Sequence, residues 1–584
     1  MKLTEALKTL QQAPQNAPPF HVALACGYTP LHVQTFLAAH LQRQLAGRRV
    51  TVSAGLYGDV LGTLASLKDA TAHGVAFPLE WADLDPRFGY REAGKWGAAA
   101  LPGIVSDAIA MLDRMAATVE AIRPEIPIAV SLPTLPLPPL FHAAGWQAAE
   151  AQLALEQKVA EFASRIARRC SLVNSARLAE ESPPAGRYDL KADLLTGLPY
   201  TLPHAAAVAW ALSRLLAPPA PKKAIVTDLD DTLWRGLAGE IGPENVSWDL
   251  ASHSQPHGLY QKLLAALAEE GVLLGGASKN DPAVVKKVFE REDLLLPPDR
   301  IFPMEVHWGA KSGSIERILR TWNIPADSVV FVDDSAMELA EAAAAHPGIE
   351  CLLFPKDDYA AAYALLWRLR DLFGKPRVSH EDSIRLESIR QGAHFQQAAG
   401  GSISETFLRE AAAVTTFDFS LTGDPRALEL VNKTNQFNLN GARYAEADWK
   451  NRLARPEEFL TIVSYRDKFG PLGKIAVLEG RCEKDVLFID TWVMSCRAFS
   501  RRIEHQCLQA MFERHAAREV FFNFHPTPRN GPLQDFLASI TGRRPDAPFA
   551  LSRALFEEKR PPLYQRTVIE TPTSSNQWIP SHSA

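Results

Sequence analysis

The sequence is poor in cysteine and lacks long apolar runs. Only six of its 584 residues are cysteine, and they are scattered without paired spacing, which favours free thiols in a reducing compartment over a disulfide framework. No stretch approaches the roughly 18 uninterrupted apolar residues that a membrane-spanning helix needs. The first fifteen residues also lack the apolar core and the cleavage site of a signal peptide. We therefore expect a cytoplasmic protein with no membrane association.

The sequence also lacks a large excess of charge of one sign. Its 62 Lys and Arg residues against 67 Asp and Glu residues give a net charge of −5, so overall electrostatics give no reason to expect nucleic-acid binding. Hydrophobic residues make up 47% and charged residues 22%, an ordinary globular composition. At roughly 100 to 200 residues per domain, the length predicts three or four packed domains.

Alternating strands and helices predict an α/β architecture in the first part of the chain. Apolar runs expected to form strands alternate with stretches expected to form helices, namely His21–Ala25, Leu31–Ala46, Arg49–Ala54, Ile126–Leu132 and Trp146–Arg169. This domain ends in a proline-rich linker, 215–223, which cannot continue a helix. We place the boundary near Pro219.

A second βαβ series and a third unit with longer strands follow. The second series is expected over Ala224–Thr227, Tyr260–Glu270, Val272–Gly275, Pro282–Glu290, Ser314–Trp322 and Ser328–Val332. The third unit is expected to be a mixed sheet with strands Phe459–Tyr465, Lys474–Glu479 and Val486–Val493 before a helix over Arg501–His515. The predicted multidomain α/β organisation is 1–218, 219–375, a helical linker 376–405, 406–545, and a partly disordered extension 546–584.

The most informative motif follows the first strand of the second series. Ala224–Thr227 leads directly into Asp228-Leu229-Asp230-Asp231-Thr232, and ligands of parallel sheets bind beyond the carboxyl ends of the strands. Two carboxylates spaced in this way can converge on one ion and one substrate. Asp228 can act as the nucleophile that forms an aspartyl-phosphate, while Asp230 donates a proton to the leaving oxygen and later activates water.

Three further blocks supply groups that suit phosphoryl transfer. Ser278 and Lys279 follow the second strand of the series and offer a hydroxyl and backbone donors for phosphoryl oxygens. Lys311 can neutralise charge on the transferring group. Asp333 and Asp334 end another apolar strand. Asp228, Asp230, Asp333 and Asp334 would repel one another without a cation, and all offer hard oxygen ligands, so the sequence predicts Mg²⁺ as their counter-ion.

These four blocks, in this order and mostly at strand ends, resemble the haloacid dehalogenase (HAD) superfamily of phosphatases and phosphotransferases. Each single block has a structural alternative, because acidic residues at strand ends are commonly turn formers or helix caps. The ordered set of four favours the catalytic interpretation.

A narrower resemblance is to the FkbH-like branch of that superfamily, over about residues 222–543. It is carried by Asp231-Thr232-Leu233-Trp234-Arg235-Gly236, by 431–439 and by 490–497. The resemblance implies removal of phosphate from 1,3-bisphosphoglycerate and delivery of the glyceryl group as a thioester to an acyl carrier protein, for polyketide biosynthesis. It also implies a C-terminal fold like that of N-acetyltransferases (GNAT).

The resemblance also implies a set of substrate-binding residues, namely Thr232, Arg235, Lys279, His307, Lys433, Asn435, Gln436 and Arg497. Alternatives stay open for several of them. Arg235 and His307 could bind a remote phosphate or pair with surface acids. The asparagine-rich segment 432–440 could be only a polar loop.

Cys496 is the candidate acyl acceptor. It lies between an expected strand and an expected helix, and a thiol near a helix N-terminus with Arg497, Arg501 and Arg502 nearby should ionise more readily. Its attack on an acyl phosphate would give a thioester that a carrier thiol can collect. The alternative is a buried structural cysteine. The bulky residues 497–502 replace the glycines that a coenzyme A pyrophosphate loop would need, so acetyl-CoA is not expected as a ligand.

Residues up to about 218 resemble an SGNH-hydrolase-like domain more weakly. An active esterase of that class needs a serine at the first strand end and an Asp-x-x-His near its close. Here Cys26 stands in the serine region and Thr201 stands three residues before His204. We expect a catalytically degraded docking or dimerisation domain, with a Cys26/His204 nucleophilic pair as the alternative.

The predicted function is thus a Mg²⁺-dependent phosphatase coupled to glyceryl transfer. Two rivals remain at this stage. A plain small-molecule phosphatase would release phosphate without a carrier and would be indifferent to Cys496, and a non-enzymatic assembly protein would carry only a vestigial site.

Overall fold

The computed structural model describes residues 1–67, 72–95, 97, 99–139, 146–375, 385–387, 389–390, 405–420, 424–455, 457–468, 470–495, 498–499 and 501–570. The chain divides into two compact units, Met1–Ala220 and Pro221–Ala584. None of the described helices is both long enough and apolar enough to span a bilayer.

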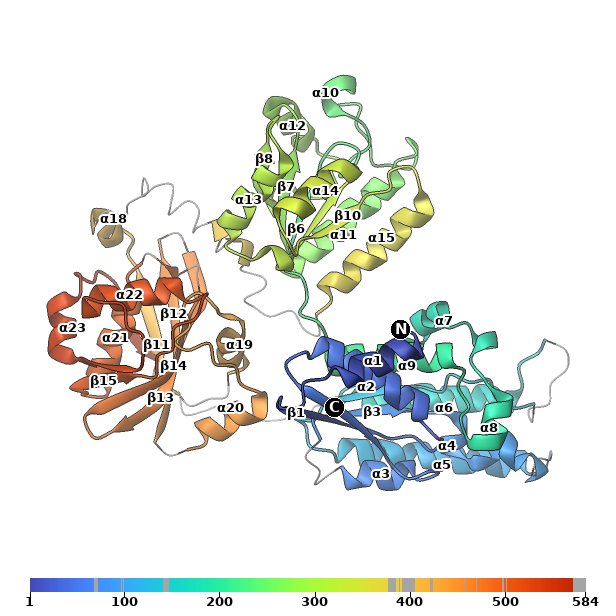
Figure 1. Cartoon of the computed structure of the whole chain (residues 1–584). Helices are drawn as coiled ribbons and strands as arrows, with labels where there is room; N and C mark the ends of the chain where they lie inside the picture. The colour runs from blue at the N-terminus through green and yellow to red at the C-terminus, as the bar shows by residue number, and fades with distance from the viewer. Residues whose placement is uncertain are drawn as a thin grey trace, which may run out of the picture. The chain divides into compact units, whose positions relative to one another are not determined.

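The first unit is built on a five-stranded parallel sheet in the order β2-β1-β3-β4-β5 (Figure 1). Its strands are β1 Pro19–Leu24, β2 Arg49–Ala54, β3 Gly74–Pro78, β4 Ile128–Ser131 and β5 Ser171–Leu172. One face is covered by α1 Leu3–Gln11, α2 Leu31–Gln44, α7 Ser175–Glu181 and α9 Leu202–Leu216, and the other by α3 Val60–Ser66, α5 Leu101–Glu120 and α6 Glu150–Ile166. The short helices α4 Trp81–Leu84 and α8 Leu190–Thr196 complete this unit.

The second unit begins with another five-stranded parallel sheet, in the order β10-β9-β6-β7-β8. Its strands are β6 Ala224–Thr227, β7 Leu273–Ser278, β8 Ile301–Val306, β9 Val329–Asp333 and β10 Glu350–Leu353. Helices α13 Lys311–Trp322 and α14 Ala336–Ala345 cover one face, and α11 Gln255–Glu269, α12 Pro282–Phe289 and α15 Tyr359–Phe373 the other. Helix α10 Ala238–Ile241 follows the Asp228 loop. Both faces being covered explains why β6 and β9 read as continuous apolar runs.

The same unit also holds a seven-stranded mixed sheet in the order β16-β15-β14-β13-β12-β11-β17. Its strands are β11 Val414–Asp418, β12 Glu458–Asp467, β13 Gly470–Glu483, β14 Val486–Met494, β15 Glu519–Phe522, β16 Phe549–Ser552 and β17 Arg566–Glu570. Helices α21 Ile503–Arg514, α22 Gly531–Thr541 and α23 Arg553–Lys559 pack on one face, and α19 Pro425–Lys433 and α20 Glu446–Leu453 on the other. Helix α18 Glu405–Glu410 precedes β11.

The multidomain α/β architecture predicted from the alternation is confirmed, and the differences are local. The mixed sheet extends past residue 545, because β16 pairs with β15 and β17 pairs with β11, so two of its strands lie in the range expected to be an extension. The expected linker 376–405 and the tail from 571 lie almost entirely outside the described residues. Helix α6 begins at Glu150 instead of Trp146, whose side chain is fully exposed.

Candidate functional site

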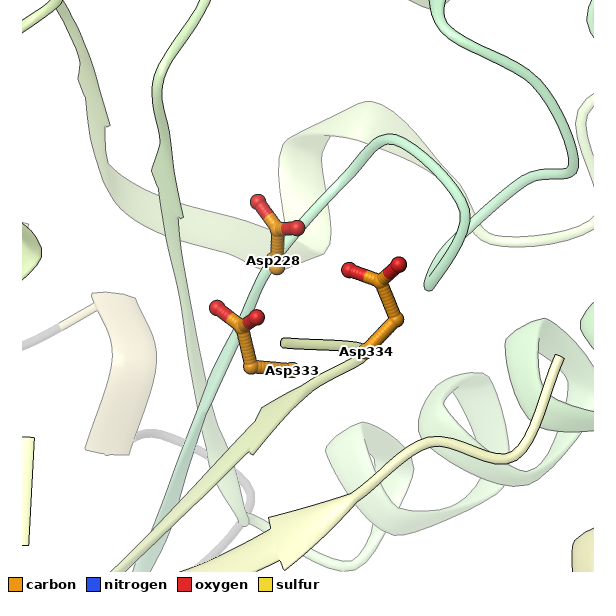
Figure 2. A group of neighbouring side chains, drawn as sticks. All are labelled: Asp228, Asp333 and Asp334. Atoms are coloured by element: carbon orange, nitrogen blue, oxygen red, sulfur yellow. The ribbon is translucent and has the colours of Figure 1, made fainter. Parts of the chain in front are cut away.

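Three carboxylates from two adjacent parallel strands meet at the carboxyl edge of the second sheet. Asp228 directly follows β6, whose four residues are all buried, and Asp333 is the last residue of β9, which pairs with β6 in parallel. Asp228, Asp333 and Asp334 each offer a ligand oxygen within 4.8 Å of those of the other two. Figure 2 shows the three carboxyl groups around one point at the strand ends.

Lys311 bridges two of these carboxylates. It is the first residue of α13, and its Nζ lies 3.0 Å from Asp228 Oδ1 and 2.5 Å from Asp333 Oδ2. All three side chains are at least nine-tenths buried. Burial raises the pKa of Asp228 to about 7, because the Lys311 charge opposes this effect only in part and the Asp333 charge adds to it. The charged end of Lys311 is thus held directly against Asp228, the predicted nucleophile.

Asp230 faces a different set of groups. Its Oδ1 accepts a hydrogen bond from Trp234 Nε1 at 2.8 Å, and its Oδ2 accepts from Asn280 Nδ2 at 2.9 Å and from the Ala238 amide at 3.2 Å. Burial raises its pKa, which favours a carboxyl that holds a proton and can act as an acid. Asp230 lies outside the three-carboxylate cluster, and its assignment as a metal ligand stays a prediction.

A second lysine, missed in the sequence, holds the neighbouring acids. Lys356 Nζ lies 2.7 Å from Asp231 Oδ2 and 3.0 Å from Asp334 Oδ2. Asp231 adopts the left-handed conformation at φ 54° and also accepts from the Gly236 amide at 2.8 Å. Although burial opposes it, the Lys356 contact leaves the pKa of Asp231 below its ordinary value. The sequence feature that could have pointed to Lys356 is its position soon after β10. It was missed because β10 itself was not predicted.

The groups expected to contact phosphoryl oxygens lie at the same edge. Ser278 is the last residue of β7, is buried, and accepts a backbone hydrogen bond from the His307 amide at 3.1 Å. Thr232 is fully buried, and its hydroxyl has no hydrogen-bond partner among the described residues. Lys279 forms an ion pair with Glu338 at 2.6 Å. Ser278 thus ends the strand that pairs with β6, and Thr232 lies in the loop that follows Asp228, whereas Lys279 is already paired.

Arg235 and His307 make contacts with protein groups. Arg235 Nη2 lies 3.1 Å from the exposed carboxylate of Asp357. His307 Nδ1 accepts from the Gly309 amide at 2.9 Å, and its Nε2 lies 2.9 Å from Ser314 Oγ. Arg235 thus pairs with a surface acid, which was the alternative left open for it, whereas the His307 contacts are with a backbone amide and a hydroxyl. Substrate contacts of both residues stay predictions.

The residues predicted on the third sheet are spread over a turn and a helix end. Lys433 ends α19 and pairs with Glu429 at 2.7 Å, and Gln436 is exposed. Asn435 accepts from Arg443 at 2.6 Å, and both residues line a cavity of about 210 Å³ together with Thr527 and Arg529. Of the substrate-binding residues predicted in this segment, Asn435 lines the 210 Å³ cavity.

Cys496 and Arg497 lie outside the described residues. Strand β14 ends at Met494 and α21 begins at Ile503, so both fall in the connection between them. Two of the three arginines expected to promote thiol ionisation already face carboxylates, with Arg501 3.4 Å from Asp467 and Arg502 3.4 Å from Glu405. The chemistry of Cys496 therefore stays a prediction.

Cys26 and His204 of the first unit do not form a pair of nucleophile and general base. The two ring nitrogens of His204 lie 2.9 Å from Ser182 Oγ and 2.8 Å from Thr134 Oγ1. The Cys26 thiol is buried, which raises its pKa well above the ordinary value. The alternative of a Cys26/His204 pair is therefore excluded in this structure.

Comparison with known proteins identifies a shared fold. No family model and no curated protein matches the chain. A solved structure of the N-terminal part of BF1531 from Bacteroides fragilis, containing a phosphatase domain complexed with Mg, matches with 18% identity and a TM-score of 0.51, over 64% of this chain and 99% of that one. An extracellular lipase from Streptomyces rimosus matches at 14% identity and a TM-score of 0.24, over 34% of this chain and 99% of that one, a likeness too low to carry weight. The chain thus shares its fold with the BF1531 structure.

Proposed function

We propose that this chain is a cytoplasmic, Mg²⁺-dependent FkbH-like enzyme that dephosphorylates 1,3-bisphosphoglycerate and transfers the glyceryl group to the thiol of an acyl carrier protein in polyketide or related biosynthesis. The observation that carries the proposal is the cluster of Asp228, Asp333 and Asp334, in which Lys311 bridges Asp228 and Asp333. In the same proposal the mixed sheet is GNAT-like and handles the acyl group, and the first unit is SGNH-like.

The donor set fits Mg²⁺. Three carboxylates converge from two strand ends, and Mg²⁺ prefers hard oxygen ligands and uses few protein carboxylates. Asp228, Asp333 and Asp334 would hold the ion. When bound, it would neutralise charge on the phosphoryl oxygens. The Mg-bound phosphatase domain in the BF1531 structure, which shares this fold, supports the same choice of metal.

Asp228, Asp230 and Lys311 have distinct roles in the proposed hydrolysis. A carboxylate oxygen of Asp228 attacks phosphorus, and the bond from phosphorus to the leaving oxygen breaks while Asp230 transfers its proton to that oxygen. Asp230 then takes a proton from water as the water oxygen attacks the aspartyl-phosphate, which releases phosphate and restores Asp228. Lys311, 3.0 Å from Asp228 Oδ1, offsets the negative charge during both steps.

Chemical balance selects which phosphate Asp228 would attack. Attack on the acyl phosphate would release a free carboxylate, which cannot acylate a thiol. Attack on the alkyl phosphate leaves the acyl phosphate intact, and Cys496 can then displace its phosphate to form a thioester. An alkoxide is a poor leaving group and needs a proton, so the raised pKa of Asp230 fits the alkyl phosphate.

The test is intact-protein mass spectrometry of a carrier protein incubated with the full chain, Mg²⁺ and 1,3-bisphosphoglycerate generated in place. We expect a glyceryl adduct on the carrier that is lost in Asp228→Asn and in Cys496→Ala. Cys482→Ala, at a partly exposed thiol of β13, serves as the matched control and should retain the adduct.

The same experiment distinguishes the coupled transferase from a phosphatase without acyl transfer. Phosphate release without a carrier adduct, unchanged in Cys496→Ala, would establish a plain HAD-type phosphatase. All of the described groups that the hydrolysis needs lie at the second sheet, so this alternative requires nothing from the third. No phosphate release from any small phosphate ester or acyl phosphate would contradict both.

A further inference from the structure

A cavity of about 270 Å³ opens at the carboxyl edge of the first sheet. Its walls come from the loops that follow three parallel strands, with Tyr28 after β1, Glu80 to Asp83 after β3 and Leu135 after β4. Its volume lies just below the roughly 300 to 1,000 Å³ of pockets for drug-sized ligands. The proposed phosphatase chemistry uses none of these residues.

Six of the 21 residues that line this cavity are aromatic. They are Tyr28, Tyr57, Trp81, Phe88, Tyr90 and Tyr188. Tyr90 stacks on Tyr188 with ring centroids 5.3 Å apart, and Trp81 packs edge-on to Phe88 at 6.5 Å. The polar ends of two rings are bound by protein, since Trp81 Nε1 donates to the Leu135 carbonyl and the Tyr188 hydroxyl donates to Asp193, at 2.8 and 2.7 Å. These contacts hold the rings in place and leave ring surface to the cavity.

Asp83 and Glu80, two of the carboxyl groups in the lining, have no cationic partner among the described residues. Asp83 accepts hydrogen bonds from the Gly27 and Glu80 amides, both at 2.8 Å. Glu80 is buried and accepts from Tyr200 at 2.6 Å and from the Leu135 amide at 3.2 Å. Neutral donors alone therefore satisfy these carboxyls. Burial raises the pKa of Asp83 to about 7, which reflects the missing counter-charge.

The basic groups nearby are directed elsewhere. Arg91 is exposed at the cavity rim and donates to the Tyr57 hydroxyl at 2.7 Å. Arg187 is buried and donates to the carbonyls of Ser182 and Thr134 at 2.8 and 2.7 Å. His204 is neutral, because burial lowers its pKa to about 3. The inner part of the cavity is therefore acidic and aromatic, with positive charge at its rim.

We propose that this cavity binds a small organic cation of the quaternary-ammonium type, with Asp83 as its counter-ion and the surrounding rings facing its methyl groups. Aromatic faces attract such cations through the ring quadrupole, and the attraction strengthens when the cation is desolvated. An anion would be repelled by Asp83 and Glu80. A neutral ligand would leave the charge of Asp83 uncompensated. A weakly hydrated cation is the ligand class that satisfies both the rings and the carboxylate.

The test is isothermal titration calorimetry of the full chain at about pH 8 with choline and with 3,3-dimethylbutan-1-ol, its uncharged carbon isostere. We expect saturable binding of choline at least about tenfold tighter than that of the isostere, because only the charge differs. Equal affinity for the two, or no saturable heat from choline, would overturn the proposal.

Two variants locate the binding site. Asp83→Asn should weaken choline binding by about tenfold or more, and Tyr90→Leu should weaken it independently by removing a ring. The second variant is needed because Asn cannot accept both backbone N–H groups that Asp83 accepts, so Asp83→Asn can also disturb the loop. Tyr363→Leu, at an exposed tyrosine of α15, is the matched control. Wild-type affinity in both cavity variants, with thermal unfolding unchanged, would place choline elsewhere and refute the assignment.

Discussion

Each of the two parallel sheets has a carboxyl group with a raised pKa in the segment that follows a central strand, and the two carboxyls face different neighbours. Burial raises the pKa of both Asp228 and Asp83 to about 7. Asp228 lies 3.0 Å from Lys311 and close to two further carboxylates. Asp83 is held by two backbone amides beside aromatic rings.

This difference shows that burial alone does not decide what a carboxyl group does. Both groups are costly to ionise because they are removed from water. At the second sheet Asp228 and Asp333 share Lys311, and Asp334 lies beside them, an arrangement that suits a divalent cation and a nucleophile. At the first sheet an acidic site lined by rings suits a monovalent organic cation. The groups that face the carboxyl, rather than its pKa, distinguish the two regions.

The largest effect is expected from Asp228→Asn. Because the variant replaces the attacking carboxylate with a far less nucleophilic amide, Mg²⁺-dependent phosphate release should fall by about 10³-fold or more, measured as phosphate formed from acetyl phosphate. Asp299→Asn, at an exposed aspartate before β8, should keep the wild-type rate. Retention of activity in Asp228→Asn would show that Asp228 is not the nucleophile, and the proposed difference in function between the two sheets would then be lost.

Lys311→Met should affect both activity and stability. It leaves the buried carboxylates of Asp228 and Asp333 without their cation, so the free energy of unfolding should fall by about 3 kcal/mol and turnover by about 10²-fold. Mg²⁺ should restore more stability to this variant than to the wild type, because the metal then supplies the missing charge. Chemical denaturation with and without Mg²⁺ measures this, and an equal gain in both proteins would show that the ion binds away from the cluster.

Choline affinity should depend on pH through Asp83. The pKa of Asp83 in the folded chain, about 7, lies above its ordinary value of 3.8, so its contribution to stability is full below about pH 4 and is lost as the pH rises to 7. Choline binding requires the ionised form of Asp83, so the affinity for choline should rise where this contribution to stability falls. We expect the affinity to increase by up to about tenfold per pH unit as the pH approaches 7 and to level off above it.

Calorimetry at about pH 5.5, 6.5 and 8 checks this dependence. Glu80, whose pKa burial also raises, can add to the slope. Glu92, Asp193 and Arg91 also face the cavity, and the profile is therefore repeated in Asp83→Asn. A flat profile in the wild type would show that the charge of Asp83 plays no part in binding.

The smallest effect is expected from Cys26→Ala. The thiol is 2% exposed and burial raises its pKa, so we expect a loss of about 1 kcal/mol in unfolding free energy and no measurable change in phosphate release. Alkylation of Cys26 in the native chain should be slow. Rapid labelling by iodoacetamide, followed by peptide mapping, would instead indicate an accessible and reactive thiol in the first unit.

The sequence located the candidate catalytic groups because they follow apolar strands. Ala224–Thr227 was predicted with the bounds that the structure has, and parallel strands bring their carboxyl ends together, so Asp228, Asp333 and Asp334 could be expected at one edge. Ser278 and Lys311 were also located, although they prove to be the last residue of a strand and the first of a helix.

Other features could not be read from the sequence. Lys356 was missed together with its strand, and the cavity of the first sheet was missed because its rings come from segments as distant as Tyr28 and Tyr188. The pairing of Lys279 with Glu338 depends on how α14 packs against the strand ends. None of these contacts has a periodic or local signature.

The sequence by itself determined the α/β class, the order of the acidic blocks and their positions at strand ends, because strand formation and the chain that leaves a strand depend on residues close together in sequence. Only the tertiary structure decided which charges meet. Lys311 contacts Asp228 and Asp333, and the partners of Asp83 in the described part of the chain are neutral amides. Such contacts between remote segments depend on packing distances that no local pattern specifies.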